Sequence, residues 1–337
     1  MNNFLFISYP LKNPWTNVYG VARSLLALGT LLTLLLNNSS ILFPEKLSGM
    51  QLMQYSGLNL LRINYFFILR DYQVFARILA MLILLFVISG YRPRFSGILH
   101  FWISSSFATY CICIEGGDQI TAILTLLLLP ICFTDHRQWH WDVAQKTEGK
   151  SNDYLRIVAL STFLFIRVQV CLVYLHAATA KFNVREWIDG TATWYWFKDP
   201  TFGLNYWVSR VAEPLVQIPF FVAMITWGSL AIELMLFLSL FLEKEKRKYF
   251  LWTGIGFHFM ILVFHGLFAF FFAMAGALIL YLRPVDMEFS FAFLRQIRIF
   301  KPGDFFNTIR LGKRETHLTP EFKPQKADNR SENMIME

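Results

Sequence analysis

Long apolar runs separated by short polar stretches make up most of the first 285 residues of the chain. A run of about 20 apolar residues has the length that an α-helix needs to cross a hydrocarbon core of about 30 Å. The pattern predicts spans at about 17–38, 72–90, 95–115, 119–133, 154–182 and 214–242, and a last apolar stretch at 249–282.

The last apolar stretch is too long for a single crossing. Its roughly 34 residues would form about 51 Å of helix at about 1.5 Å per residue, against a core of about 30 Å. We therefore expect a break near His265–Gly266, with a short span on each side. The pattern as a whole predicts an all-α, polytopic integral membrane protein with about eight transmembrane helices.

Composition supports this class of protein. Of the 337 residues, 55% are hydrophobic and only 16% are charged, and the mean hydropathy is +0.43. A soluble domain is about a quarter charged. The net charge of +8 comes mainly from Lys and Arg between apolar runs. Such residues orient the spans, so the charge does not indicate a nucleic-acid partner.

Basic clusters also suggest an orientation in the membrane. The densest are YRPR at 91–94, the loop at 134–153, EKEKRK at 243–248 and the C-terminal tail. Placing them all on the inner side puts both termini in the cytoplasm. We expect a transmembrane domain at 1–285 and a basic cytoplasmic tail at 286–337. The tail would begin with an interfacial helix at 287–301 and be disordered from about 311.

The helix predicted at 154–182 carries polar residues on two faces. Arg167, Tyr174 and Lys181 recur every seven residues and so share one face, whereas Gln169 and His176 share roughly the opposite one. A helix that is polar on two sides is expected to be surrounded by other helices rather than by lipid. A WIDGTA segment and a run of aromatic residues follow it, which is typical of a membrane–water interface.

Ionisable groups within spans are costly, so they are candidates for function. By counting along the helices, Lys181, Asp118 and His265 come near the outer face, together with Glu115. Arg167 and Glu233 come deeper, at similar depths, and are expected to form an ion pair between two spans. Further candidates are Tyr174, His176 and His258.

Lys181 is the sharpest of these candidates. A lysine at the end of a span normally reaches out to the headgroups, which is the simpler interpretation. Enclosure away from water would instead favour the neutral amine, which can act as a base or a nucleophile. His136 and His140 lie four residues apart in a polar loop. We expect them to be surface residues, and no metal site is predicted.

Two segments resemble known families. The opening NPWTNVYGVARSLLALGTLLTLL (13–35) closely resembles the sporulation-delaying protein B family, and the resemblance covers about the first 285 residues. These bacterial membrane proteins are required for the maturation of a secreted antimicrobial peptide. More broadly, VYLHAATAKFNVREWIDGTA (173–192) resembles the horizontally transferred transmembrane domain shared with vitamin K-dependent gamma-glutamyl carboxylase. That resemblance implies that Lys181 matches the carboxylase base, followed by Trp187, Asp189 and Gly190.

This chain departs from the carboxylase pattern in two respects. It has Ala180–Lys181 where the carboxylase has two lysines, and one extra residue separates lysine from tryptophan. The carboxylase also has large lumenal domains, whereas only a short tail follows residue 283 here. The resemblance thus implies a scaffold and a candidate base but not carboxylation, and it leaves the cofactor open, a quinone being suggested by resemblance alone.

The expected function is the maturation of an antimicrobial peptide precursor, with Lys181 as a general base and with His265 and Asp118 nearby to orient it or relay protons. The alternative is a non-catalytic scaffold that presents the precursor to a companion or a protease. A transporter is a third interpretation, although no inverted repeat supports it. The expected partners are the precursor, a small companion like sporulation-delaying protein A, and membrane lipid.

Overall fold

The computed structural model describes residues 12–43, 62–142 and 150–290, and all of these except residue 290 belong to a compact unit ending at Phe289. Within these ranges the chain forms helices and one isolated β-bridge, between Tyr91 and Trp139. The predicted all-α fold is therefore confirmed. Most of the interfacial helix predicted at 287–301, and the tail from about 311, lie outside the described residues.

Long helices occupy each of the predicted spans. Five are long and apolar enough to cross a membrane, at Asn17–Leu36, Arg70–Ser89, Gly116–Thr134, Asp153–Lys181 and Pro219–Phe241, and the apolar helix Phe268–Leu282 is shorter. The long helices of the described ranges are α1 (Asn17–Leu36), α5 (Gln73–Ser89), α6 (Pro93–Tyr110), α7 (Gly116–Thr134), α8 (Lys150–Lys181), α12 (Pro219–Leu238), α13 (Lys244–His265) and α14 (Phe268–Leu282).

Short helices connect these long ones. They are α2 (Ser39–Leu42), α4 (Tyr65–Ile68), a 3-10 turn η2 (Arg70–Tyr72), α9 (Arg185–Ile188), α10 (Ala192–Lys198), α11 (Tyr206–Val216) and a second 3-10 turn η3 (Ser239–Phe241). The predicted break between the last two spans is confirmed. Gly266 ends α13 in the left-handed region, with φ +74°, which favours glycine because a side chain would clash there.

The start of α7 is a capped helix N-terminus. Glu115 caps the helix, and Asp118 in its first turn returns the contact, so the two residues form a capping box. Gly116 and Gly117 are therefore helical. Because α6 already ends at Tyr110, before the predicted boundary near 115, Glu115 lies in the connection between two spans.

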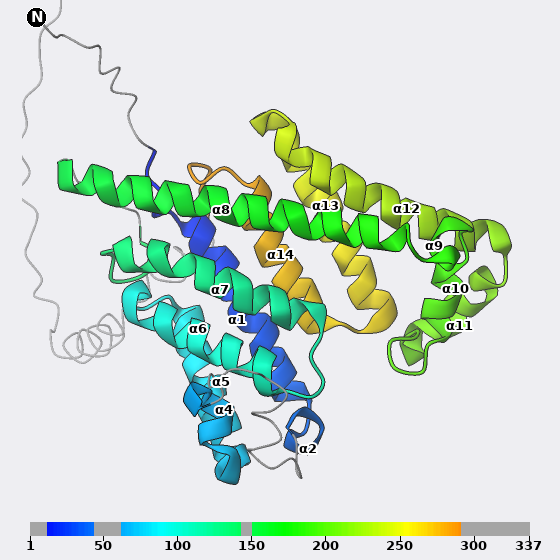
Figure 1. The fold of residues 1–337 in the computed structure, drawn as a ribbon, viewed down its shortest axis with the longest axis horizontal. Helices are drawn as coiled ribbons and strands as arrows, with labels where there is room; N and C mark the ends of the chain where they lie inside the picture. Colours follow the sequence, from blue (N-terminus) through cyan, green and yellow to red (C-terminus); the bar gives the residue numbers. More distant parts are fainter. Residues whose placement is uncertain (1–11, 44–61, 143–149, 291–337) are drawn as a thin grey trace, which may run out of the picture. The chain divides into compact units, whose positions relative to one another are not determined.

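The helix α14 forms the centre of the unit, between α1 and α13 (Figure 1). It is buried continuously from Ala273 to Leu282. Two glycines let α1 and α14 approach at backbone distance. A Cβ on Gly276 would lie 2.9 Å from the carbonyl oxygen of Ala22, and one on Gly29 would lie 3.0 Å from that of Ala269.

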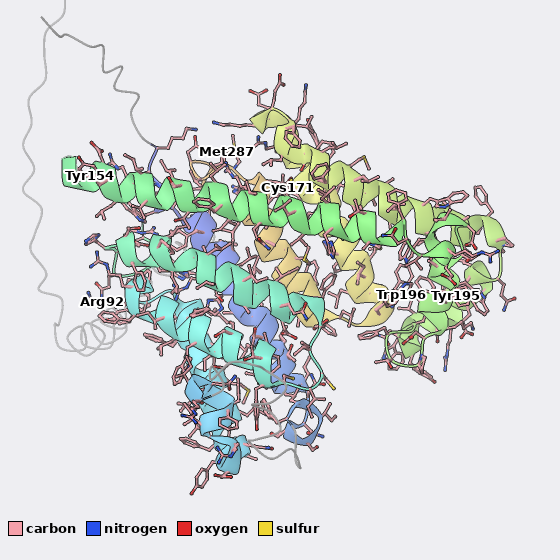
Figure 2. The ribbon with its side chains drawn as sticks, viewed as in Figure 1. Arg92, Tyr154, Cys171, Tyr195, Trp196 and Met287 are labelled. Carbon is pink, nitrogen blue, oxygen red and sulfur yellow. The ribbon has the colours of Figure 1, made fainter. Side chains whose placement is uncertain are left out.

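Basic segments gather at one end of the bundle. The backbone N–H of Arg92 donates to the carbonyl of Gln138 at 2.7 Å, and Arg94 donates to the carbonyl of Asp135 at 3.1 Å. The opposite end holds the aromatic residues that follow α8. Figure 2 shows Tyr195 and Trp196 there, far from Arg92. Tyr195 is 55% exposed and Trp196 46%, as expected for interfacial anchors.

Candidate functional site

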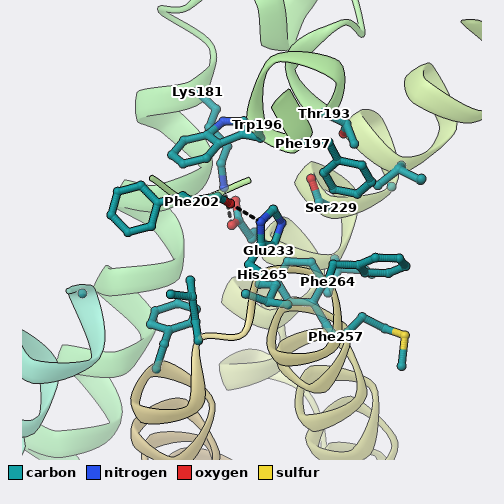
Figure 3. A pocket seen from close by; sticks show the side chains of 18 of the residues that line it. Lys181, Thr193, Trp196, Phe197, Phe202, Ser229, Glu233, Phe257, Phe264 and His265 are labelled. Carbon is teal, nitrogen blue, oxygen red and sulfur yellow. Dashed lines mark hydrogen bonds and ion pairs between the residues drawn. The ribbon is translucent and has the colours of Figure 1, made fainter. Parts of the chain in front are cut away.

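An apolar cavity of about 830 Å³ lies where α8, α12 and α13 meet the starts of α7 and α14. Its polar lining includes Lys181, Glu233, Glu115 and His265, and Figure 3 shows three of these side chains, Lys181, Glu233 and His265, close together. Charges interact more strongly beside apolar walls than they do in bulk water. The aromatic lining residues are Trp187, Trp196, Phe197, Phe202, Phe257, Phe264 and Phe270.

Lys181 and Glu233 form an ion pair in this cavity. The Nζ of Lys181, the last residue of α8, donates to Oε1 of Glu233 on α12. The same Nζ lies 4.8 Å from the centre of the Trp187 ring, close enough for a cation–π contact. Glu233 is only 7% exposed. The structure thus joins Glu233 to Lys181 and not to Arg167, the partner that the sequence predicted.

The positions of α8 and α12 explain this correction. Residues 182–218 include three short helices, α9 to α11, before α12 begins at Pro219. The α12 segment from Pro219 to Glu233 spans about 21 Å at about 1.5 Å per residue. Contact between Glu233 and Lys181 therefore means that α12 begins well beyond the end of α8. Arg167 lies about 21 Å further down α8 and has a buried Nε without a hydrogen-bond partner.

Tyr174 and His258 form a second polar contact next to the ion pair. The hydroxyl of Tyr174 lies 3.0 Å from Nε2 of His258, and both side chains are buried. Tyr174 shares its helix face with Lys181, as the spacing predicted. The charge of Glu233 acts on Tyr174 and that of Lys181 acts on His258, so the two pairs lie close together.

His176 lies on the opposite face of α8 and is exposed. The helix is therefore covered on the face of Tyr174 and Lys181, and the expectation that other helices surround it on both sides is wrong. Neighbouring apolar residues such as Leu172 and Phe165 are also exposed, at 50% and 66%. This face of α8 has the character of a surface towards lipid.

His265 lines the same cavity as Lys181. Its Nδ1 lies 2.5 Å from the carbonyl oxygen of Phe202. Because a carbonyl only accepts, Nδ1 carries the hydrogen, and Nε2 is the acceptor nitrogen of the neutral ring. His265 can thus accept a proton at Nε2.

Asp118, the third predicted catalytic residue, occupies a capping position. It is 2% exposed and accepts a hydrogen bond of 3.2 Å from the backbone N–H of Glu115. Glu115 is the acidic side chain of this turn that lines the cavity. Burial raises the pKa of Glu115 to about 7, and the charge of Asp118 adds to this, whereas a hydrogen bond from the backbone of Phe270 opposes it.

The three residues that the carboxylase resemblance singled out in the WIDGTA segment, Trp187, Asp189 and Gly190, have different roles in the structure. Trp187 lines the cavity against Lys181. Asp189 accepts hydrogen bonds from the backbone N–H of Thr191 at 3.1 Å and from its hydroxyl at 2.6 Å. Gly190 has φ +83°, and a Cβ there would lie 3.0 Å from the ring of Trp227. Trp187 therefore belongs to the site, and Asp189 and Gly190 shape the turn that presents it.

A separate buried polar cluster surrounds Arg23 on α1. Its Nη2 donates to the hydroxyl of Ser96 at 2.6 Å. His140 lies nearby and is wholly buried, so the expectation of a surface residue is wrong. Burial, followed by the charges of Arg23 and Arg137, lowers the pKa of His140 well below its usual value. No group of three or more metal-binding side chains occurs within the described ranges.

Five helices that are long and apolar enough to cross a bilayer define the chain as an α-helical membrane protein. It is 39% identical over 295 residues to the uncharacterized protein YitO of Bacillus subtilis (strain 168), covering 85% of this chain and 91% of YitO. It is 34% identical over 286 residues to the sporulation-delaying protein SdpB of the same strain, covering 82% of this chain and 84% of SdpB.

The chain belongs to the SdpB family. The predicted resemblance to sporulation-delaying protein B is thereby confirmed, and the relation to the carboxylase stays a prediction. No protein-family model and no solved structure matches the chain.

Proposed function

We propose that this protein acts in the maturation of a secreted antimicrobial peptide, and that the cavity at Lys181 and Glu233 engages the peptide precursor. The observation that carries this proposal is a buried ion pair in an aromatic cavity, in a chain related to a sporulation-delaying protein. A volume of about 830 Å³ accommodates several side chains of an apolar peptide.

In the catalytic version, Lys181 serves as a general base. Its ammonium proton already points at Glu233, and a medium of low dielectric favours a neutral amine beside a neutral acid over two charges. Transfer of that proton to Glu233 leaves the amine of Lys181 able to accept a proton from a substrate. His265 contributes a second acceptor at Nε2, and Glu115 takes the place foreseen for Asp118.

In the alternative version, the protein is a non-catalytic scaffold. The ion pair then only joins α8 to α12, and the cavity holds the precursor for a companion like sporulation-delaying protein A or for a separate protease. The pairing of Lys181 with Glu233 favours this version to the extent that both groups stay charged. The aromatic walls would also accommodate a quinone, which the carboxylase resemblance suggests, but neither version depends on one.

The substitution Lys181→Arg distinguishes the two versions. Arginine keeps the positive charge and can pair with Glu233, but it cannot act as a base near neutral pH. In the catalytic version, cells carrying Lys181→Arg have a normal level of the protein in the membrane and secrete no mature peptide, as judged by immunoblot and mass spectrometry.

The matched control is Lys198→Arg, because Lys198 pairs with Glu213 at 3.5 Å on an exposed surface. It should leave the mature peptide unchanged. Full peptide production by Lys181→Arg would exclude the base and leave the scaffold. Full production by Lys181→Ala as well, at normal protein level, would count against any role of the cavity in maturation.

A further inference from the structure

Two carboxylate oxygens of the cavity lining have no hydrogen-bond partner. Glu233 uses Oε1 for Lys181, but its Oε2 is buried and unpartnered. Oε2 of Glu115 is likewise buried and unpartnered. Among the described residues that line the cavity, these two are the buried side-chain N or O atoms in that condition. In the ionised form of each side chain both oxygens are acceptors, so what the cavity lacks is donors.

The charges of the cavity point in the same direction. Lys181 neutralises Glu233. Glu115 takes part in no ion pair within the described residues, and its known donors are the backbone N–H groups of Asp118 and Phe270 at the starts of α7 and α14. The site therefore carries two acidic side chains and one basic one. A ligand with a carboxylate or a phosphate would add to this imbalance, whereas a cation would remove it.

The rest of the lining specifies an apolar ligand body. The walls are aromatic and aliphatic, and Trp187 already holds one ammonium group over its ring. Aromatic faces attract cations while they pack against hydrocarbon. An ammonium group supplies three N–H donors and one positive charge. An ammonium group therefore complements the two features of the cavity: the carboxylate of Glu115, which has no ion-pair partner among the described residues, and the unpartnered Oε2 of Glu233.

We propose that the polar group recognised by this cavity is a primary amine on an apolar body, and that it is the free amino end of the peptide. The assignment of a peptide rests on the proposed function, whereas the preference for an amine rests on Glu115 and Glu233 alone. The cavity thereby binds a precursor whose amino end is free, and it excludes one whose chain continues at that position.

Binding of matched peptides to the purified protein in lipid nanodiscs tests this inference. The probes are an alternating alanine–phenylalanine hexapeptide amide with a free amino end, its N-acetylated form, and an N-acetylated form with one lysine at the other end. Isothermal titration calorimetry should give at least about tenfold tighter binding for the free amine than for either acetylated peptide.

The preference should fall below about threefold in Glu115→Gln, which keeps the shape of the side chain and removes its charge. Glu233→Gln should have the same effect, but it strands Lys181, so Glu115→Gln is the main variant. Glu213→Gln, an exposed acid paired with Lys198, should keep the full preference. Circular dichroism of each variant verifies that the helices are intact.

Equal affinity for the free and acetylated peptides would overturn the inference, as would no binding of any probe at millimolar concentration. Equal binding of the free amine and the lysine peptide would overturn the assignment to the amino end. The binding measurement does not depend on peptide secretion. If Glu115→Gln abolishes the amine preference in vitro but cells still produce mature peptide, the proposed role in maturation fails and the ligand chemistry stands.

Discussion

At the scale of single residues, the ion pair of Lys181 and Glu233 predicts a coupled effect on stability. Removing one partner leaves the other charge largely buried and unpaired, so Lys181→Met or Glu233→Leu should each lower the free energy of unfolding by about 3 kcal/mol. The double variant leaves no charge stranded and should recover most of this loss. Denaturant unfolding in detergent measures the cycle, and additive single effects would show that the two residues do not interact.

Glu115 gives a pH dependence of stability. Burial, aided by the charge of Asp118, raises its pKa to about 7, against the backbone hydrogen bond from Phe270. A raised folded-state pKa stabilises the fold below the unfolded value of about 4.3, and this contribution is lost as the pH rises through about 7. The stability of Glu115→Gln relative to wild type should therefore rise between pH 5 and pH 8, by on the order of 2 kcal/mol over that range.

Thermal unfolding of both proteins at four pH values measures this difference. Gln keeps a carbonyl oxygen that can cap α7, so the helix start should be retained. Glu213→Gln serves as the control, because Glu213 is half exposed, and its difference from wild type should stay flat over the same range. A flat difference for Glu115→Gln would mean that this carboxyl group titrates as it would in water.

At the scale of elements, the sequence could predict which residues share a helix face but not which helices meet at the same level. Period and spacing placed Tyr174 and Lys181 together, and the structure agrees. The partner of Glu233 depended on where α12 begins, which is set by α9 to α11 and their turns. The sequence predicted Asp118 as the acid of the site, whereas Glu115 lines the cavity. The two acids form a capping box at the start of α7, and the geometry of this cap, which the sequence pattern does not give, decides which of them faces the cavity.

Close packing of α1 against α14 gives an element-scale prediction. A Cβ on Gly276 would lie 2.9 Å from the carbonyl oxygen of Ala22, a backbone atom that cannot rotate away. Gly276→Ala should therefore lower the free energy of unfolding by about 1–3 kcal/mol, the usual cost of overpacking. Gly256→Ala is the matched control, because nothing lies within 4 Å of a Cβ there.

The control should be neutral or stabilise α13 by up to about 1 kcal/mol, since alanine favours helix more than glycine does. Equal effects of the two substitutions on denaturant unfolding would contradict backbone contact between α1 and α14.

At the scale of the whole molecule, hydropathy alone predicted the helices well. Lipid cannot satisfy backbone hydrogen bonds, so an apolar run of sufficient length has few structures available besides a helix. The exposed apolar faces of α5 and α8 agree with this, with Phe75 58% and Phe165 66% exposed. The cavity could not be predicted in the same way, because it arises where α8 and α13 end, α7 and α14 begin and α12 passes, and so depends on the relative positions of these helices.

Topology is the prediction that concerns the whole molecule. Basic segments on either side of α6 and α7 meet at one end, where Arg92 contacts Gln138, and the cavity lies at the other. If the basic end faces the cytoplasm, the cavity opens on the outer side, where a secreted peptide is available. Alkaline phosphatase fused after Asp199 should then be active, and the same enzyme fused after Lys248 should be inactive. A cytoplasmic fluorescent protein at the two positions should give the reverse pattern. Activity of the phosphatase at both positions, or at neither, would exclude the eight-span arrangement and an outward-facing cavity.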